Sequence, residues 1–236
     1  MEKITYNGAS NLLIIMKKVV IFGVGNFAKL VHSYLKNSPH EVVGFTVNKK
    51  MLNEPVFLDL PIIPFENIDK KYPPKDFCLF IAMGHTNMNK NRARIFNESK
   101  KLGYELLSYV HPTSIIGEDV KMGENCLILE NNVIKPYVTI GNNVIIQSSN
   151  VISHDVIIKD HCFIIDQVVI LGHVTIESYC IICANSTIRN RITIAKECII
   201  GIGALIMKNT IEKGVYAIGS AQRLPITSDR IKDITS

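Results

Sequence analysis

Residues 140–176, divided every six residues, read IGNNVI IQSSNV ISHDVI IKDHCF IIDQVV ILGHVT I. An aliphatic residue, or in one case methionine, opens each hexad, and this spacing continues without a break from Ile116 to Ile206. A period of six matches neither the 3.6 residues of a helical turn nor the two-residue alternation of a free strand. It is typical of a parallel β-helix, in which the strand bends every six residues. The sequence therefore predicts an all-β domain that is a left-handed parallel β-helix.

The fourth residue after these aliphatic positions is mostly small or of modest size. The residues at this second position include Val120, Cys126, Val138, Val144, Val156, Cys162, Val168, Cys180, Ser186, Cys198 and Ala204. One large and one small inward side chain per hexad suit a narrow prism with three flat faces and 18 residues per coil. Residues 18 apart should then lie directly above one another, and this rule locates the candidate chemistry.

The six cysteines could suggest disulfides or zinc, because Cys180-x-x-Cys183 resembles half of a metal site. The hexad register favours another interpretation. Cys126, Cys162, Cys180 and Cys198 occupy the small inward position in one column, whereas Cys183 falls at a different point of its hexad. We therefore expect reduced cysteines that pack as small hydrophobic side chains.

The composition is that of a globular protein with one or two domains, since 47% of the 236 residues are hydrophobic and 20% are charged. No apolar run reaches the ~18 residues of a membrane span, and residues 1–16 lack the pattern of a signal peptide. We therefore expect a cytoplasmic protein without a membrane partner. The net charge of +5 favours small anionic partners such as phosphorylated ligands. The basic residues are dispersed without interleaved aromatics, which argues against nucleic acid.

Residues 17–110 predict a small Rossmann-like α/β domain that follows an extension of residues 1–16. The run KVVIF at 18–22 is typical of a buried parallel strand, and GVGNFA at 23–28 is a G-x-G-x-x-A turn before an amphipathic helix. The glycines would let the backbone approach a ligand, and the helix N-terminus would favour a phosphate. A tight strand-to-helix turn without a ligand is the alternative explanation.

The rest of this domain argues against a full dinucleotide site. The second strand, at 41–46, is followed by VNK at 47–49 and not by the acidic residue that would hold the ribose of a nicotinamide cofactor. Further strands are expected only at 77–83 and 104–110, which is too few for the doubled fold. We therefore expect a site for a nucleotide or a nucleotide sugar.

Prolines at 61, 64, 73 and 74 predict a connecting loop with one short helix near 65–69. A further helix is expected at 90–102, where Arg92 and Arg94 either face solvent or contact the ligand's phosphates. The prism would occupy residues 111–214, and residues 215–236 would form a cap over its last coil.

His154 lies two residues after an inward isoleucine, near a corner of the prism, and the residue 18 beyond it is Gly172. Stacking would place the imidazole about one rung from a backbone N–H that no side chain blocks. This pair suits acyl transfer, because a base takes the proton of an attacking amine or hydroxyl while an amide stabilises the oxyanion. Asp155 could orient the ring if the corner brings the two side chains together, and His173 stacks over Asp155. The alternative is a surface histidine at a corner.

Three histidines on the prism, His154, His161 and His173, could suggest zinc instead. They fall at different points of the hexad, and no two of them are 18 apart. We therefore expect no metal site within one subunit.

Over residues 17–225 the chain resembles the two-domain hexapeptide-repeat sugar acyltransferases, which include bacillosamine-pathway amino-sugar N-acetyltransferases and sialic acid O-acetyltransferases. The motifs that carry the resemblance are Ile21-Phe22-Gly23-Val24-Gly25, His111-Pro112-Thr113-Ser114-Ile115-Ile116, Ser153-His154-Asp155, Asn185-Ser186, and Gly214-Val215-Tyr216 with Ala221-Gln222-Arg223. The resemblance implies a homotrimer with acetyl-CoA in the groove between neighbouring prisms and a nucleotide-linked sugar on the α/β domain.

The resemblance also implies roles for single residues. His154 matches the catalytic base, Asp155 its acidic helper and Gly172 the oxyanion amide. The residues that would line the coenzyme groove are Gly172, Ala184, Asn185, Gly201, Ile202, Gly203 and Ala221. Those that would meet the nucleotide are Gly23, Gly25, Asn26, Asn48 and Gly84.

The chain departs from the family at three places. Phe163 stands where some members carry a second histidine, nine residues after the base. Asn48 or Lys49 occupies the position after the second strand where an acidic residue is common, and Ser220 stands where proline is usual.

We therefore expect an acetyl-CoA-dependent N-acetyltransferase of polysaccharide biosynthesis that acts on a nucleotide-linked amino sugar, a 4-amino-4,6-dideoxyhexose, without a metal. The alternatives are O-acetylation of a sugar hydroxyl, a metal-dependent lyase or hydrase on the same prism, and a non-catalytic nucleotide-sugar sensor.

Overall fold

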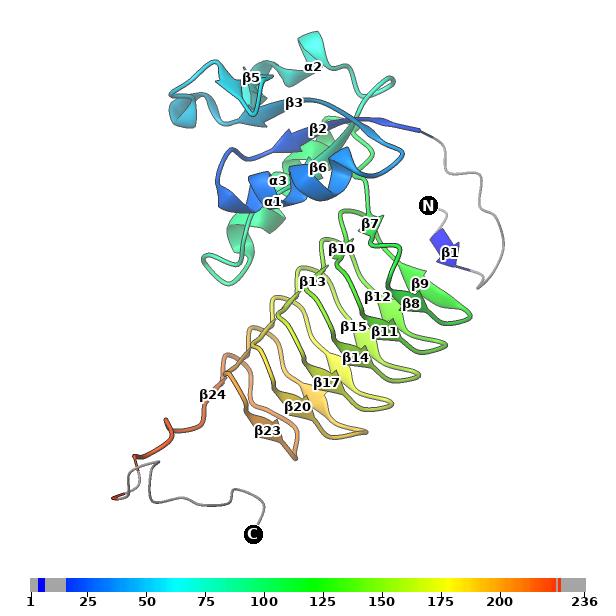
Figure 1. The fold of residues 1–236 in the computed structure, drawn as a ribbon, viewed down its shortest axis with the longest axis vertical. Coiled ribbons are helices and arrows are strands. Elements are labelled where there is room, and N and C mark those ends of the chain that lie inside the picture. The colour runs from blue at the N-terminus through cyan, green and yellow to red at the C-terminus, as the bar shows by residue number, and fades with distance from the viewer. Residues whose placement is uncertain (1–3, 7–15, 224, 226–236) are drawn as a thin grey trace.

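The computed structural model describes residues 4–6, 16–223 and 225. In this part of the chain, an α/β domain packs against one side of a long three-sided prism (Figure 1). Among the described helices we find none with the length and hydrophobicity that a bilayer crossing requires.

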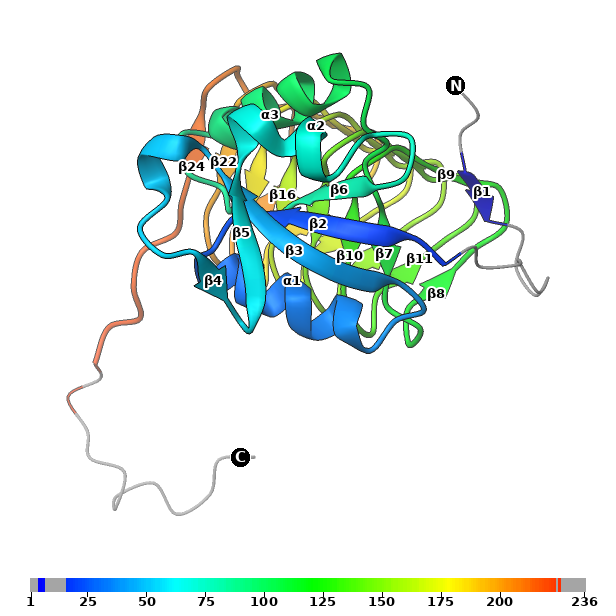
Figure 2. The ribbon, with the colours of Figure 1, turned by 90° about the horizontal axis from the view of Figure 1, so that it is seen from above.

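The α/β domain is a five-stranded sheet covered by helices on both faces (Figure 2). Its elements are β2 (Lys18–Phe22), α1 (Asn26–Lys36), β3 (Glu41–Val47), the 3-10 helix η1 (Lys49–Met51), β4 (Val56–Phe57), β5 (Leu60–Pro64), the 3-10 helix η2 (Phe65–Asn67), α2 (Ile68–Lys71), β6 (Cys78–Ile81) and α3 (Lys90–Lys101). The strand order is β4-β5-β3-β2-β6, and only β4 is antiparallel. Helix α1 packs on one face, and α2 and α3 pack on the other. The expected Rossmann-like domain is confirmed.

Two segments of this domain differ from the sequence-based expectation. The proline-containing stretch expected to be a loop includes strand β5, which pairs with β3 and β4. Pro61 and Pro64 lie near the ends of this short strand, where a missing N–H disrupts few ladder bonds. The stretch 104–110 is not a full strand of the sheet, because only Leu106 bridges to Leu79. Its last two residues, Tyr109 and Val110, pair with the prism instead.

The prism consists of two- and three-residue strands that stack into three parallel faces (Figure 1). Face 1 contains β7 (Tyr109–Val110), β10 (Leu127–Ile128), β13 (Ile145–Ile146), β16 (Phe163–Ile164), β19 (Ile181–Ile182), β22 (Ile199–Ile200) and β24 (Val215–Tyr216). Face 2 contains β8 (Ile115–Ile116), β11 (Val133–Ile134), β14 (Val151–Ile152), β17 (Val169–Ile170), β20 (Thr187–Ile188) and β23 (Leu205–Ile206). Face 3 contains β9 (Val120–Met122), β12 (Thr139–Ile140), β15 (Ile157–Ile158), β18 (Thr175–Ile176) and β21 (Thr193–Ile194), and β1 (Ile4–Tyr6) pairs antiparallel with β9.

From β7 to β23, every pairing within the prism joins residues 18 apart. The three-hexad coil that the sequence predicts is therefore confirmed. Strand β24 adds one more rung to face 1, and the residues after it, 217–223, are exposed and without regular structure. The cap expected at 215–236 therefore begins with a short strand, and its residues 224 and 226–236 lie outside the described residues.

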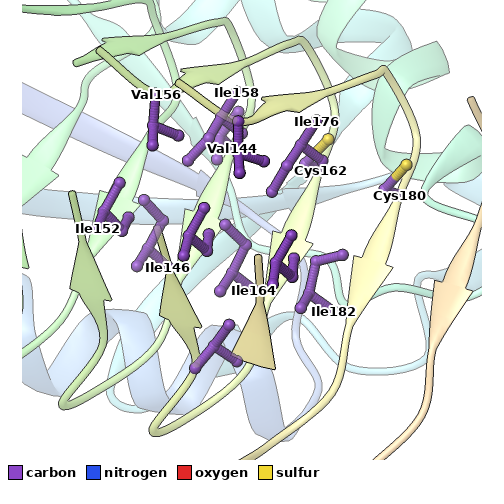
Figure 3. Packing of buried hydrophobic residues seen from close by; sticks show 14 of the residues in the cluster. Val144, Ile146, Ile152, Val156, Ile158, Cys162, Ile164, Ile176, Cys180 and Ile182 are labelled. Atoms are coloured by element: carbon purple, nitrogen blue, oxygen red, sulfur yellow. The ribbon is translucent and has the colours of Figure 1, made fainter. Parts of the chain in front are cut away.

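The inward side chains form one continuous apolar column (Figure 3). Isoleucines such as Ile146, Ile164 and Ile182 are fully buried, and each contributes roughly 1.5–3 kcal/mol to folding. The inward cysteines, among them Cys162 and Cys180, are also buried, and all six cysteines are free thiols. The interpretation of the inward cysteines as packing residues is therefore confirmed.

Each corner of the prism contains a residue in the left-handed region, three positions after the inward isoleucine. These residues, with φ between 55° and 70°, are Asp119, Asn125, Asn131, Tyr137, Asn143, Ser149, Asp155, His161, Gln167, His173, Tyr179, Asn185, Arg191, Glu197 and Gly203. Such a conformation costs a non-glycine residue about 1–2 kcal/mol, which burial of the inward column offsets. The corners therefore repeat with one backbone geometry, and their side chains stack in columns.

The α/β domain packs on face 1. Outward side chains of this face, including Leu127, Ile145 and Phe163, are buried in the same apolar cluster as α1 and the sheet. A polar column runs beside this cluster: Asn125 Oδ1 accepts from Ile81 N–H at 2.7 Å, Asn125 Nδ2 donates to Asn143 Oδ1 at 2.8 Å, and Asn143 Nδ2 lies 2.9 Å from His161 Nδ1. Burial lowers the pKa of His161 to about 4, so its neutral ring accepts this hydrogen bond.

Arg92 joins the two domains. Its side chain is fully buried and has no acidic partner among the described residues. Five hydrogen bonds of 3.1–3.3 Å run to neutral oxygens: Asn143 Oδ1 and the carbonyls of Met83, Gly84, Asn143 and Cys162. Burial lowers the pKa of Arg92 to about 9, so the guanidinium stays charged at neutral pH. Neither sequence-based expectation for Arg92, solvent or phosphate contact, is correct, because α3 turns this residue into the domain interface.

We predict that Arg92→Ala lowers the free energy of unfolding by about 3 kcal/mol or more, because it leaves several buried carbonyls without donors. Chemical denaturation measures this change. Arg94→Ala is the matched control, since Arg94 makes only an exposed i,i+4 ion pair with Glu98, and it should change stability by less than about 0.5 kcal/mol. Equal effects of the two substitutions would contradict the structural role assigned to Arg92.

Candidate functional site

His154 and Asp155 occupy the corner between face 2 and face 3, directly after β14. The Nδ1 atom of His154 lies 2.8 Å from Asp155 Oδ2. The corner geometry makes this contact possible, because Asp155 has φ 57° and turns its side chain back toward its neighbour. An ionised carboxylate only accepts hydrogen bonds, so Nδ1 carries the hydrogen and Nε2 is left with a free lone pair. Both side chains are exposed to solvent.

Gly172 lies one coil beyond His154 and leaves room for the imidazole. A Cβ atom placed on Gly172 would be 2.9 Å from both Cε1 and Nε2 of the ring. The backbone on either side is bonded, since Leu171 N–H donates to Ile188 and His173 N–H donates to His154. Gly172 N–H itself makes no hydrogen bond within the described residues. The expected stacking of His154 and Gly172 is therefore present, and the catalytic roles assigned to these two residues stay predictions.

The N–H group at this corner position is hydrogen-bonded at some corners of the prism and has no partner at others within the described residues. At three other corners the equivalent N–H groups, of Glu124, Asn142 and Ser148, donate to side chains one coil further on. The acceptors are Asn142 Oδ1, Asp160 Oδ1 and Asp166 Oδ1, at 2.6–3.0 Å. Gly172 N–H has no such partner, and neither do the equivalent N–H groups of Asp160, Asp166 and Ala184 within the described residues. What distinguishes Gly172 is the ring of His154, which lies where a side chain on residue 172 would be.

His173 completes this edge of the prism. Its Nδ1 atom lies 4.0 Å from Asp155 Oδ2, and its ring meets that of His154 edge-to-face with 5.1 Å between centroids. His161, the other prism histidine, is buried between Phe96 and Tyr179 and takes no part in the site.

The residues expected to line the coenzyme groove lie mainly on a different edge. Ala184, Asn185 and the segment 201–203 follow face 1 strands β19 and β22, so they form the corner between face 1 and face 2. Face 2 separates them from His154 and Gly172 within one protomer. Ala221 lies beyond β24 in the exposed terminal segment.

Two of these groove residues have a structural reason to be glycine. A Cβ on Gly201 would lie 2.9 Å from the carbonyl oxygen of Tyr216, and Gly203 has φ 70° with Ile218 3.0 Å from its Cβ position. Ile202 between them is 69% exposed, which leaves its side chain free for a ligand or a second protomer.

The glycines expected to meet the nucleotide also differ in what surrounds them. A Cβ on Gly23 would lie 2.8 Å from the Ala82 carbonyl, and its φ of 123° favours glycine, so this residue serves strand packing. Gly25 and Gly84 have no atom within 4 Å of their Cβ positions and are open to a ligand. Asn26 begins α1 beside Gly25. The G-x-G motif therefore contains one structural and one open glycine.

Asn48 lines a cavity of about 840 Å³ together with Lys49, Lys50, Glu66 and Arg94. The cavity lies at the carboxyl ends of β3 and β5, next to α3. Lys50 and Glu66 were not among the expected site residues. The stretch that forms β5 was expected to be a loop, so Glu66, which follows it, was not placed beside the end of β3. Recognising the β-branched run before Pro64 as a strand would have located Glu66.

Phe163, which stands where some family members have a second histidine, faces the α/β domain. It is 3% exposed and contacts Phe27, His85 and the Arg92 guanidinium. Within one protomer it therefore lies beneath the Gly25 and Gly84 loops and not at the His154 edge.

Comparison with known proteins finds one family model that matches part of this chain and several solved structures with a similar fold. Residues 119–154 and 155–190 match the family model described as bacterial transferase hexapeptide (six repeats). A search of curated protein sequences finds no significant match. Solved structures with the same two-domain architecture are known.

A mutant of perosamine N-acetyltransferase from Caulobacter crescentus, in complex with CoA and GDP-perosamine, has a TM-score of 0.76 at 20% identity over 87% of this chain and 95% of its own. The acetyltransferase domain of PglB from Neisseria gonorrhoeae has a TM-score of 0.74 at 17% identity, over 84% of this chain and 95% of its own. WeeI from Acinetobacter baumannii has a TM-score of 0.72 at 18% identity, over 86% of this chain and 95% of its own. Residues 119–190 of the prism therefore match bacterial transferase hexapeptide repeats, and the expected fold, a small α/β domain followed by a left-handed parallel β-helix, is confirmed.

Proposed function

We propose that the protein is an acetyl-CoA-dependent N-acetyltransferase that acts on a nucleotide-linked amino sugar, a 4-amino-4,6-dideoxyhexose. The observation that carries this proposal is the position of the His154 ring against Gly172, whose N–H makes no hydrogen bond within the described residues. A base and an oxyanion donor on the same edge are the two groups that acyl transfer to an amine requires.

In this mechanism the sugar amine attacks the thioester carbonyl of acetyl-CoA. His154 Nε2 accepts the proton that the nitrogen loses, and Asp155 holds Nδ1–H so that Nε2 remains the acceptor. Gly172 N–H stabilises the oxyanion of the tetrahedral intermediate, an effect worth roughly 2.7–4 kcal/mol for one donor. When the intermediate collapses, the C–S bond breaks, the thiolate leaves and takes up the proton, and the products are an amide and free coenzyme A.

The comparisons support both substrates. A perosamine N-acetyltransferase with the same two-domain fold was solved with CoA and GDP-perosamine, and the PglB domain was solved with acetyl coenzyme A. In this chain the cavity at Asn48 offers Lys49, Lys50 and Arg94 to an anionic ligand, and Gly25 and Gly84 leave the nearby backbone open. These features suit the phosphates of a nucleotide sugar.

The distribution of the site over two edges supports a homotrimer. The base lies on the edge between faces 2 and 3, and the coenzyme residues lie on the edge between faces 1 and 2. Face 2 between them presents an outward column of Ile115, Val133, Val151, Val169 and Leu205, of which Ile115 and Leu205 are more than 60% exposed. A second copy that covers face 2 would bring its own edge against the first and complete the groove between prisms.

We predict that His154→Ala lowers kcat/KM for acetyl transfer by about 10²–10⁴-fold and leaves coenzyme A binding intact. Thiol release with candidate nucleotide 4-amino sugars measures the rate, and calorimetry measures coenzyme binding. His111→Ala, which removes a histidine away from this edge, is the control and should retain activity. Full turnover by His154→Ala would refute the assignment of the base.

The same assay on the wild-type protein tests the reaction itself. Mass spectrometry should find one acetyl group in an alkali-stable amide. An alkali-labile ester would show O-acetylation instead, and binding of the nucleotide sugar without thiol release would show a sensor.

We predict that Gly172→Ala loses activity to a similar extent although the amide N–H is retained, because the added methyl group displaces the His154 ring. The fold should tolerate the change, since alanine is compatible with a residue outside the left-handed region. The double variant with His154→Ala should lose no more than either single variant, because both act through the same ring. Additive losses would contradict this coupling.

We predict that the protein is a trimer in solution and that Val151→Glu on face 2 dissociates it and abolishes transfer. Light scattering after size exclusion measures the mass, and circular dichroism verifies the fold. Lys75→Glu, an exposed substitution on the α/β domain, should leave the trimer intact. An active wild-type monomer would contradict the composite site.

A further inference from the structure

We propose that His154, Asp155 and His173 together bind one transition-metal ion, of the Zn²⁺ or Ni²⁺ class, and that this ion blocks the acetyl-transfer base. The binding site stands on geometry alone, whereas the inhibitory consequence rests on the proposed function. The ion is an inhibitor in this proposal and not a cofactor of the reaction.

The three side chains offer ligand atoms at metal-site spacing. One nitrogen or oxygen from each lies within 4.8 Å of the others. The Asp155 Oδ2 atom is shared, at 2.8 Å from His154 Nδ1 and 4.0 Å from His173 Nδ1. Tetrahedral zinc with bonds of about 2.0–2.1 Å places its ligand atoms about 3.4 Å apart, so only small side-chain rotations are needed.

The backbone of the prism holds these residues in place. Asp155 and His173 are 18 apart and share the left-handed corner position, with φ 57° and 59°, so they stack on successive coils. His154 joins them because Gly172 leaves its ring free to lie against the next coil. From the histidine spacing no shared site was expected, because no two of the three histidines are 18 apart. The pair that is 18 apart is a carboxylate and a histidine.

The ligand set selects the kind of ion. Two imidazoles and one carboxylate suit zinc, copper and nickel, whereas magnesium and calcium prefer oxygen ligands throughout. Three protein ligands leave a fourth position open to water. All three side chains are 41–52% exposed, so an ion can reach them directly from solvent.

Metal binding and base catalysis exclude each other at this site. An imidazole nitrogen that coordinates a metal has no lone pair for a proton, and coordination by Asp155 removes the partner that fixes the His154 tautomer. A bound ion would therefore stop acetyl transfer reversibly, and a chelator would restore it.

The test is a titration of the chelator-treated full-length protein with Zn²⁺ by calorimetry, and with Co²⁺ by its visible absorption. We expect one ion per protomer. His173→Asn and Asp155→Asn should each weaken binding by about 10–100-fold or more, since even outer-shell losses have this effect. His111→Asn is the matched control and should bind like the wild type.

Arg191 provides a test of the sign of the local charge. Arg191 occupies the same corner column as His173, one coil beyond it. Because Arg191→Gln removes a cation near the proposed site, this variant should bind Zn²⁺ at least as tightly as the wild type. Absence of stoichiometric binding, or unchanged affinity in His173→Asn, would overturn the proposal. Neither titration needs acetyl-CoA or a sugar, so metal binding can be observed even if the protein does not transfer acetyl groups. A failure to bind metal would likewise leave the proposed acetyl transfer untouched.

Discussion

Vertical stacking at a spacing of 18 residues is the constraint on which the rest of this structure depends. Each inward isoleucine lies above another because the coil closes after three hexads, and each coil closes because a residue at every corner adopts the left-handed conformation. The apolar column stabilises this repeated conformation, which isolated residues would rarely adopt. The same stacking then decides which polar side chains meet on the outside of the prism.

A second constraint fixes the α/β domain on the prism. The guanidinium of Arg92 is buried without a counter-charge, and its five donors are all used by neutral oxygens from both domains. Two of these oxygens, the carbonyls of Met83 and Gly84, belong to the loop that follows β6. Arg92 therefore holds the loop at Gly84, which is expected to meet the nucleotide, against the prism. In the proposed function the nucleotide sugar and the coenzyme would then bind to two domains that this residue joins.

The parts of the structure that follow a strict period could be predicted from the sequence. The hexads located every strand from β8 to β23 and placed His154 beside Gly172, because an 18-residue coil leaves no freedom of register. Strand β5 was missed because its prolines indicated a loop, although prolines near the ends of a short strand disrupt few ladder bonds. The burial of Arg92 was missed because nothing in the pattern of α3 shows that its polar face packs on a second domain. The stacking of His173 over Asp155 was expected, but the contact of the His173 and His154 rings was not, because it depends on the direction in which the His154 side chain turns.

The corner at Gly172 shows how a repetitive fold can differ at one place. At three corners the equivalent N–H groups donate to Asn or Asp side chains from the next coil, and the prism gains stability from each of these bonds. At residue 172 the missing side chain admits the His154 ring, and the missing hydrogen bond leaves the amide free. Gly172 is buried in the described structure, so a backbone donor without a partner is costly there. In the proposed function this cost would be recovered when the amide donates to a developing oxyanion.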